Sequence, residues 1–450
     1  MFSAGKKRHT KLHIIKQGPG IILKLPCQLA NVPVKSETQV KLWKIIYKEG
    51  NMGVISKEME TLLATGSTLR TMFEEGKRLA KEYGAENVYD FSLGNPSVPA
   101  PEEFNEAIKS VVDENDSFAL HAYMSNPGYE ETRQAIADDL NSRFGSSYSF
   151  ANICMTVGAA NAIVVAMKIL TGPGDEVAVF APFFLEYRNY ISNFGAKCTI
   201  VPPNPPSFMP DPNALRSTLT ENTKAVIINN HNNPNGVIYP KSVIKEITAV
   251  LEEAQEKYGH PIFIISDEPY RELVYGKADV PFIPDYYKNT LIAYSYSKSL
   301  AIPGERVGYL AIPDCADEAE TLKAAMSIGI RVLGCVNAPS LQQKAIIKAL
   351  SSRADTTQYE KNRELLLGGL KKAGFSYVEP DGAFYVFMMT PTEDDNEFVE
   401  RAKNKYRILT ASGSSFYCPG YVRLAYCVSE DMIKRALPYF ELLGKDYGLC

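Results

Sequence analysis

The sequence predicts an α/β fold with a largely parallel sheet, and three observations lead to it. Short apolar, β-branched runs alternate with segments of helical periodicity over much of the chain. The 450 residues, 45% of them hydrophobic and 22% charged, can bury a large core in at least two domains. Polar residues follow directly after several apolar runs. Because ligands of open α/β sheets bind beyond the carboxyl ends of the strands, we expect the functional residues there.

Seven segments are predicted to be strands. They are Ile153–Thr156, Glu176–Phe180, Cys198–Val201, Ala225–Asn229, Ile262–Ser266, Leu291–Tyr294 and Val307–Ile312. A helix is predicted between the fourth and fifth strands, over residues 243–258, because its apolar residues recur at helical spacing. Ser242 is placed as its N-cap, and Gly259 lies just past its end. We expect this helix to cover one face of the sheet.

Two strand ends carry turns with functional potential. After Ile153–Thr156, the small residues Gly158, Ala159 and Ala160 precede a helix predicted over residues 162–170, whose exposed amides can receive an anion. Small residues also open many buried helices, so this signal alone is weak. After Ala225–Asn229, the run His231-Asn232-Asn233-Pro234-Asn235-Gly236 is also typical of a simple turn.

Two further strand ends carry charged side chains. Asp267 follows the strongly apolar strand Ile262–Ser266, where an unpaired carboxylate would cost several kcal/mol, so we expect a cation to meet it. Lys298 follows Leu291–Tyr294. Burial would lower the pKa of its amine and leave a nucleophile able to form a Schiff base with an aldehyde.

A lone lysine is most often an ordinary surface residue, and the neighbours of Lys298 decide between the two interpretations. Ser295 and Ser297 carry hydroxyls, and Arg306 lies beyond a Pro-Gly turn. Together with the amine they offer hydrogen-bond donors and a fixed cation that suits a phosphate.

The Ser-x-Ser-Lys run, with Arg306 eight residues after Lys298, resembles the cofactor-lysine motif of fold-type I, pyridoxal-phosphate-dependent class I/II aminotransferases. Further matches in the family's order spread over residues 89–430. They are Leu93–Pro96, Pro182–Phe184, the Asn-Pro-x-Gly run at 233–236, Pro380–Tyr385 and Gly420–Leu424. The family usually has Glu where Asn95 stands here, a departure close to substrate specificity and not to the chemistry.

The resemblance implies a fold and a division into domains. A large domain that binds pyridoxal phosphate, with a mixed, mostly parallel sheet flanked by helices, is expected over residues 95–335. A smaller α+β domain is expected over residues 336–450, with residues 52–94 packing against it.

The resemblance also implies a role for each matching residue. Lys298 would bind pyridoxal phosphate as a Schiff base and then move the proton between the substrate Cα and C4′ of the cofactor, with Asp267 and Tyr270 as the other catalytic groups. Asp267 would keep the pyridine nitrogen protonated. The other expected cofactor contacts are Asn233 and Tyr270 at the ring hydroxyl, Phe184 on the ring face, and Gly158, Ala159, Ala160, Ser295 and Arg306 at the phosphate. Substrate contacts are expected from Gly94, Asn233 and Arg423, with Arg423 holding the α-carboxylate.

Tyr123 matches the family's tyrosine that reaches the phosphate of the neighbouring subunit, which implies a homodimer with shared active sites. The substrates are an amino acid and a 2-oxo acid of unspecified kind. Arg331 lies where dicarboxylate-specific members carry a second arginine, but its neighbours align only with a shift, and it stays unassigned.

Two other functions remain open at this point. The same scaffold and residues serve C–S β-lyases, so elimination is the alternative to transamination. A more distant alternative is a non-catalytic regulator built on the same fold. Such a regulator would need a helix-turn-helix, and residues 1–51 show no clean pair of amphipathic helices.

Several classes of partner are not expected. The net charge of −4, without a basic stripe, argues against nucleic acid, and no apolar run approaches the roughly 20 residues that span a bilayer. The eight cysteines include no Cys-x-x-Cys, and His231 has no carboxylate or thiol at ligand spacing, so we expect neither a metal site nor a disulfide framework. Reduced thiols are typical of a cytoplasmic protein.

The first 51 residues differ in charge from the rest. They hold ten lysines and arginines against two acidic residues, a local charge of +8, which leaves −12 for the other 399 residues. We interpret residues 1–51 as a poorly ordered basic extension, with a natural family start near Met52 and a helix over Leu69–Tyr83. Support for a targeting peptide is thin, since the segment has one arginine and few serines.

Overall fold

The computed structural model describes four stretches of the chain, residues 15–17, 20–22, 54–65 and 68–450. Contacts divide the chain into two units, Met1–Ser67 and Thr68–Cys450. The first unit contains an antiparallel pair of strands and one described helix, which are β1 (Ile15–Gln17), β2 (Gly20–Ile22) and α2 (Lys57–Thr65). Most of the extension predicted to be poorly ordered, and Met52, lie outside the described residues.

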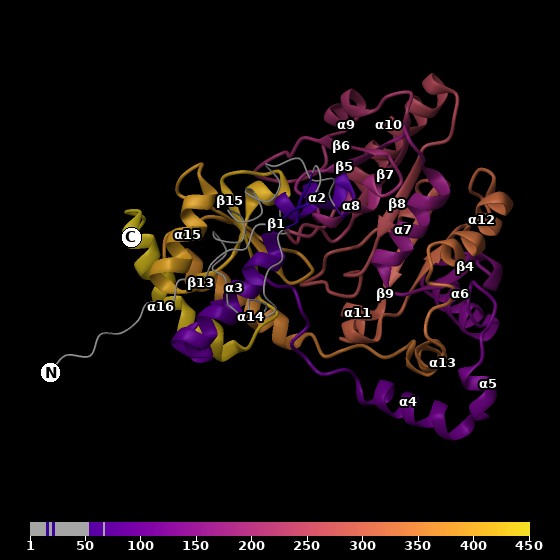
Figure 1. Ribbon diagram of the computed structural model, residues 1–450, viewed down its shortest axis with the longest axis horizontal. Coiled ribbons are helices and arrows are strands. Elements are labelled where there is room, and N and C mark those ends of the chain that lie inside the picture. Colours follow the sequence, from indigo (N-terminus) through magenta and orange to yellow (C-terminus); the bar gives the residue numbers. More distant parts are fainter. Residues whose placement is uncertain (1–14, 18–19, 23–53, 66–67) are drawn as a thin grey trace. The chain divides into compact units, whose positions relative to one another are not determined.

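A seven-stranded sheet dominates the second unit (Figure 1). Its order is β4-β10-β9-β8-β7-β5-β6, and β10 alone is antiparallel to its neighbours. The bounds are β4 (Ile153–Thr156), β5 (Glu176–Phe180), β6 (Lys197–Val201), β7 (Thr223–Asn229), β8 (Phe263–Asp267), β9 (Thr290–Ser295) and β10 (Gly308–Ala311). The predicted mostly parallel sheet is confirmed. Bounds differ by one or two residues because ladder hydrogen bonds, and not hydrophobicity, decide where a strand ends.

Helices cover both faces of this sheet, since its central strands are apolar on both sides. Val177 and Val179 of β5 share a core with α7 (Ala159–Leu170) and α12 (Ala319–Val332). Ala178 of the same strand faces the other core, which includes residues of two further helices, α9 (Pro212–Thr218) and α10 (Lys241–Tyr258). A third core joins β4, β9 and β10 to α4 (Glu102–Glu114), α6 (Glu130–Phe144) and α13 (Ser340–Ala349).

Two helices begin two or more residues earlier than predicted. Helix α10 starts at Lys241, and Pro240, not Ser242, is its N-cap, because the Pro240 carbonyl already accepts the N–H of Ile244 at 3.1 Å. Helix α7 starts at Ala159 and not at residue 162. Gly158, at a φ of 92°, turns the chain there, and its carbonyl accepts the N–H of Ala162 at 3.1 Å.

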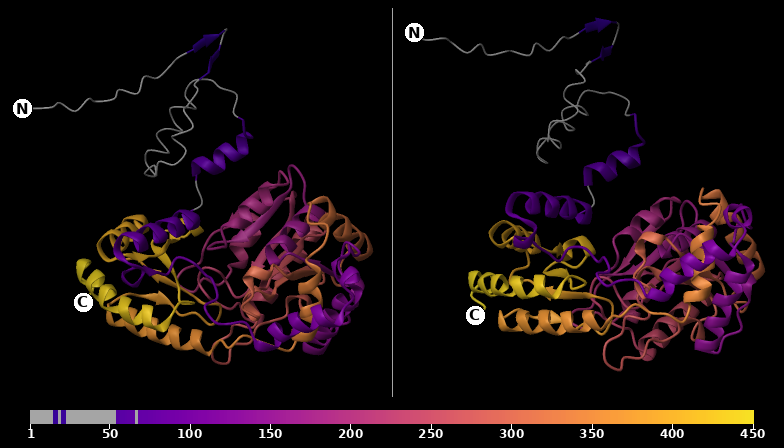
Figure 2. Two further views of the ribbon diagram at one scale, coloured as in Figure 1. Left: turned by 60° about the horizontal axis from the view of Figure 1, so that its bottom comes forward. Right: turned by 90° about the horizontal axis from the view of Figure 1, so that it is seen from below.

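The C-terminal part, whose ribbon is orange to yellow in Figure 2, forms a second, antiparallel sheet. The strand order of this sheet is β11-β12-β15-β14. A short parallel pair, β3 with β13, joins residues 89–90 to residues 408–409. Residues 68–90 and 357–446 contribute the following elements: α3 (Thr68–Tyr83), β3 (Tyr89–Asp90), α14 (Thr357–Lys372), β11 (Tyr377–Val378), β12 (Tyr385–Met389), α15 (Asp395–Tyr406), β13 (Ile408–Leu409), β14 (Ala411–Ser412), β15 (Tyr421–Ala425) and α16 (Glu430–Asp446). The domain bounds 52–94, 95–335 and 336–450 stay predictions.

Shorter helices complete the second unit. They are α5 (Ser117–His121), α8 (Glu186–Ser192) and α11 (Tyr296–Ser299), with 3-10 turns at Ala85–Asn87, Phe150–Asn152, Ile283–Asp285, Pro303–Glu305 and Gly413–Phe416. No helix in the described residues is long and apolar enough to cross a membrane.

The parallel strands bring the polar residues that follow them to one edge of the large sheet. Asn229, the last residue of β7, lies opposite Asp267, the last residue of β8. Asp267 in turn lies opposite Ala293 of β9, two residues before Ser295. The segments expected to carry the chemistry therefore meet where the sequence predicted.

Candidate active site

Lys298 lies in the short helix α11, directly after β9, with the Ser295 side chain capping that helix. Its Nζ donates a hydrogen bond to the carbonyl oxygen of Gly94 at 2.8 Å and lies 5.1 Å from the ring centroid of Phe384. Burial lowers the pKa of the amine to about 8. About a tenth of the amine is therefore unprotonated at pH 7, far more than for an ordinary lysine, and the unprotonated form is the one that a nucleophile or base requires.

Asp267 ends β8 and is buried. Its Oδ2 accepts hydrogen bonds from the hydroxyl of Tyr187 and, at 3.4 Å, from Nδ2 of Asn229. Oδ1 has no partner among the described residues. Burial raises the pKa of this carboxyl to about 7, against the opposing effect of the Tyr187 bond. Among the described residues no cation pairs with this carboxyl as the sequence led us to expect, so the free oxygen suits a positively charged N–H donor.

Arg423 lies in β15 and is 2% exposed. Its Nη1 donates to Oδ1 of Asn233 at 2.9 Å, and its Nη2 donates to the carbonyl of Ser92 at 2.5 Å. Its Nε has no partner within the part of the chain that the structure describes. Asn233 and Arg423, each predicted to contact the substrate, are thus brought together. A buried guanidinium held by neutral groups suits a carboxylate ligand.

The turn before α7 meets Arg306. Nη2 of Arg306 donates to the carbonyl of Val157 at 3.0 Å, and Nη1 approaches Oγ of Ser297 at 3.4 Å. A Cβ on Gly158 would lie 2.6 Å from that Nη2, so the close approach requires glycine. Ala159 and Ala160 begin α7, where amides have no partner within the helix. Amides, hydroxyls and a guanidinium at one point suit a phosphate.

Ser295 contributes to this group through Ser297. The two hydroxyl oxygens are 2.7 Å apart, and Ser295 Oγ also accepts the N–H of Ser297 at 3.1 Å. Ser297, not Ser295, contacts Arg306. The hydroxyl pair therefore extends from the helix cap to the guanidinium.

The two adjacent phenylalanines have different surroundings. Phe183 is 2% exposed and stacks on Tyr417 with ring centroids 5.3 Å apart, so it belongs to the core. Phe184 is half-buried and meets the ring of Tyr187 edge-on at 5.6 Å. Both rings contact Tyr187, whose hydroxyl binds Asp267, and Phe184 is the more exposed of the two.

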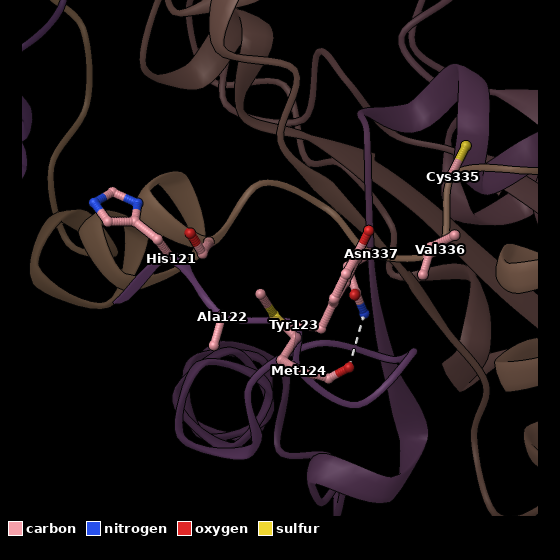
Figure 3. A pocket seen from close by; sticks show the side chains of 8 residues that line it. His121, Ala122, Tyr123, Met124, Cys335, Val336 and Asn337 are labelled. Atoms are coloured by element: carbon pink, nitrogen blue, oxygen red, sulfur yellow. Dashed lines mark hydrogen bonds between the residues drawn. The ribbon is translucent and has the colours of Figure 1, made fainter. Parts of the chain in front are cut away.

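Tyr123 is 91% exposed in one chain. It lines a surface pocket together with His121, Cys335 and Asn337 (Figure 3). Nδ2 of Asn337 fixes the loop after Tyr123 by donating to the carbonyl of Ser125 at 2.7 Å. Its role at the phosphate of a neighbouring subunit stays a prediction.

Several residues at the site were given no role by the sequence, and three of them stand out by their side-chain contacts. They are Tyr187, which binds Asp267; Tyr385, whose hydroxyl is 3.1 Å from that of Tyr270; and Cys427, which contacts the carbonyl of Leu93. Tyr385 stands in a run that matched the family, and this is a signal that could have identified it.

His231 is buried, its ring nitrogens have no partners among the described residues, and burial lowers its pKa to about 3.

A sequence profile described as aminotransferase class I and II matches residues 86–440. The chain belongs to the class I and II aminotransferase family. This aminotransferase depends on pyridoxal phosphate, as its family does. The predicted family, fold, enzyme class and cofactor are therefore confirmed.

The aminotransferase has relatives with named activities. It is 30% identical to an aspartate aminotransferase from Pyrococcus horikoshii, over 84% of this chain and 95% of the relative. It is also 30% identical to a probable N-acetyl-LL-diaminopimelate aminotransferase from Bacillus subtilis, over 79% and 89%. A crystal structure of an aminotransferase from Eubacterium rectale matches with a TM-score of 0.86 and 44% identity, over 88% of this chain and 100% of that one.

The residues present fit pyridoxal phosphate. The free Oδ1 of Asp267 suits a protonated ring nitrogen, and the amine of Lys298 suits an aldehyde. Arg306 and the turn at Gly158 suit a phosphate.

Proposed function

We propose that Lys298, Asp267 and Arg423 carry the amino-group transfer of this enzyme. The observation behind the proposal is that all three side chains are largely buried and that each can make a further interaction with a ligand. The amine has a lowered pKa, the carboxyl has an unpartnered oxygen, and the guanidinium has an unpartnered Nε. When bound at Lys298, pyridoxal phosphate supplies an electron sink that makes the Cα proton of an amino acid acidic.

Lys298 acts as the base that takes the Cα proton and later returns one. A pKa of about 8 supports this role, because base and conjugate acid are both populated near neutral pH. The carbonyl of Gly94, 2.8 Å from Nζ, limits the directions in which the amine can point. A base held in one direction needs little reorganisation before proton transfer.

Asp267 holds the proton on the ring nitrogen through its free Oδ1. Tyr187 and Asn229 fix the other oxygen, so the carboxylate cannot turn away. A cation at Oδ1 would return the carboxyl to its charged form, which burial alone disfavours.

Arg423 binds the α-carboxylate of the substrate and thereby orients the Cα–H bond that breaks. Asn233 and Ser92 hold its two terminal nitrogens, which fixes the plane of the guanidinium. Tyr270 and Asn233 bind the ring hydroxyl, and Phe184 restrains the plane of the ring. Gly158, Ala159, Ala160, Ser295 and Arg306 bind the phosphate.

The enzyme works as a homodimer in which Tyr123 of one chain reaches the phosphate site of the other. The exposure of Tyr123 supports this, because a tyrosine 91% exposed in one chain gains most from burial against a partner.

The reaction is tested by mixing the loaded enzyme with single amino acids and 2-oxoglutarate. Aspartate is the first donor to try, because relatives are named for it. We expect the new 2-oxo acid and glutamate in equal amounts, and none of either with Lys298→Ala. Release of ammonia and pyruvate without exchange of amino groups would overturn transamination in favour of β-elimination.

We also place the enzyme in the cytoplasm. The seven cysteines in the described part of the chain are all free, and Cys154, Cys418 and Cys427 are buried. Free thiols are typical of a reducing compartment. Fractionation of cells that express the full chain, followed by detection of the protein, tests this location.

A further inference from the structure

Tyr385 is a buried tyrosine that contacts several parts of the site without an assigned role. It is the first residue of β12, is 3% exposed and lies next to β15, the strand of Arg423. Its hydroxyl lies 3.1 Å from the hydroxyl of Tyr270. The guanidinium carbon of Arg423 lies 4.6 Å from the centroid of its ring.

The same hydroxyl lies against the backbone of Gly94. A Cβ built on Gly94 would come within 1.8 Å of the Tyr385 hydroxyl oxygen, so the contact is possible only with glycine. The Gly94 carbonyl receives the hydrogen bond from Lys298. One side chain therefore touches Tyr270, Arg423 and the residue that holds the lysine.

We propose that Tyr385 is a positioning residue, whose hydroxyl orients that of Tyr270 and whose ring supports the guanidinium of Arg423. The proposal rests on the function proposed above, in which Tyr270 binds the ring hydroxyl of the cofactor and Arg423 binds the substrate. It adds that one tyrosine fixes both contacts.

The direction of the hydrogen bond follows from the number of protons available. A tyrosine hydroxyl has one proton to donate. If Tyr270 gives its proton to the oxygen on the cofactor ring, it can only accept from Tyr385. Burial raises the pKa of Tyr385 to about 12, so its proton stays in place at neutral pH. Tyr385 is therefore the donor.

A donor behind Tyr270 changes how well Tyr270 donates. Hydrogen bonds in a chain polarise one another, so the bond from Tyr270 to the ring oxygen becomes stronger. A stronger bond stabilises negative charge on that oxygen. When the protein stabilises the negative charge on the ring oxygen, that oxygen attracts the proton on the lysine nitrogen less strongly. The nitrogen of Lys298 would therefore lose its proton at a lower pH.

The test is a pH titration of the absorbance of the loaded enzyme without substrate. In Tyr385→Phe we expect the midpoint of the absorbance change to rise by about half a pH unit, the size expected for one neutral hydrogen bond. Tyr270→Phe should raise it further. The double variant should match Tyr270→Phe alone, because Tyr385 acts through Tyr270.

A matched control is Tyr275→Phe. Tyr275 is also buried, and its hydroxyl donates to the carbonyl of Ala383, near Tyr385 in sequence but outside the site. Its removal should cost stability without moving the midpoint. Thermal unfolding of all variants separates loss of fold from loss of positioning.

Steady-state kinetics test whether the ring of Tyr385 supports the guanidinium of Arg423. Tyr385→Phe keeps the ring and should leave the KM for the amino acid within about twofold, whereas Tyr385→Leu should raise it severalfold. An unchanged midpoint in Tyr385→Phe, or shifts that add in the double variant, would overturn the inference while the wild-type titration still supports the proposed function. A wild-type protein that takes up no pyridoxal phosphate would overturn both.

Discussion

Asn233 and Arg423 are 190 residues apart in the sequence, and the amide oxygen of Asn233 accepts a hydrogen bond from Nη1 of Arg423 at 2.9 Å. Asn233 follows β7 of the large sheet, and Arg423 lies in β15 of the C-terminal sheet. The bond thus joins the two sheets at the point where we place the substrate carboxylate.

We expect the enzyme to be yellow when pyridoxal phosphate is bound at Lys298. Lys298→Ala should abolish this colour and lower turnover by about 10⁴-fold or more, because both the covalent attachment and the base are lost. Absorbance spectra and the exchange assay measure the two effects. The thermal unfolding temperature should not fall, since a buried amine is removed from a site where charge is disfavoured. A variant with wild-type turnover would contradict the assignment of the lysine.

Asp267 should make the stability of the apoenzyme depend on pH. Its pKa is about 7 when folded, against 3.8 as the ordinary value. Between these pH values the folded chain keeps a proton that the unfolded chain has lost, so stability falls as pH rises from about 4 to about 7, by about 4 kcal/mol at most. Unfolding temperatures at pH 5 and pH 7.5 should differ more for wild type than for Asp267→Asn. Equal pH dependence in both would refute this.

Catalysis should respond to the same residue. Asp267→Ala should still bind pyridoxal phosphate, more weakly, and lose about 10²–10³-fold in turnover, because nothing then holds the proton on the ring nitrogen. Turnover equal to wild type would mean that the carboxylate is only structural.

Arg423→Leu should raise KM and lower kcat for amino acids, with a combined loss of about 10²-fold or more, because the lost contact both binds and aligns the substrate. Arg423→Lys should lie between, since it keeps the charge but not the two-pronged geometry. Cofactor content, measured by absorbance, should change little in both. Loss of cofactor would assign Arg423 to a different part of the site.

Tyr123→Phe should weaken cofactor binding about tenfold or more without changing the reactivity of Lys298, as expected for one hydrogen bond to a charged group. Mixed dimers give a sharper measurement. If the site is shared, a dimer of one Lys298→Ala chain and one Tyr123→Phe chain contains one complete site and exceeds the average of its parents. Full activity in a monomer would contradict a shared site.

Residues 1–51 should be dispensable for catalysis. The family match begins at residue 86, and the net charge of this segment is positive whereas that of the remaining chain is negative. A chain that starts at Met52 is expected to express, bind pyridoxal phosphate and turn over like the full chain. Loss of solubility or of activity on truncation would show that the segment packs on the enzyme.

The sequence predicted the residues whose position depends on local structure. Asp267 and Lys298 follow strands whose apolar, β-branched residues are evident without a structure, and the edge of a parallel sheet brings strand ends together. The helix start at Lys241 was missed because both Pro240 and Ser242 are typical before or at a helix start, and only hydrogen bonds distinguish them.

The tyrosines at the site could not be predicted in the same way. Tyr187 meets Asp267 across 80 residues, and Tyr385 meets Tyr270 across 115. Neither contact has a local pattern, since each depends on how two separate elements pack. The role of Tyr123 rests on the resemblance alone and stays a prediction, because a contact between chains would leave no pattern within one chain.

The segment after β3 holds two cations of the site, Lys298 and Arg423, on one short length of backbone. The carbonyl of Ser92 receives Arg423, and the carbonyl of Gly94, two residues on, receives Lys298. Lys298 and Arg423 are therefore positioned by the same backbone segment. Small movements between the two sheets should change the distance between these two side chains little. A displacement of this backbone would carry both groups in the same direction, so alignment errors at the two ends of the substrate would be correlated and not independent.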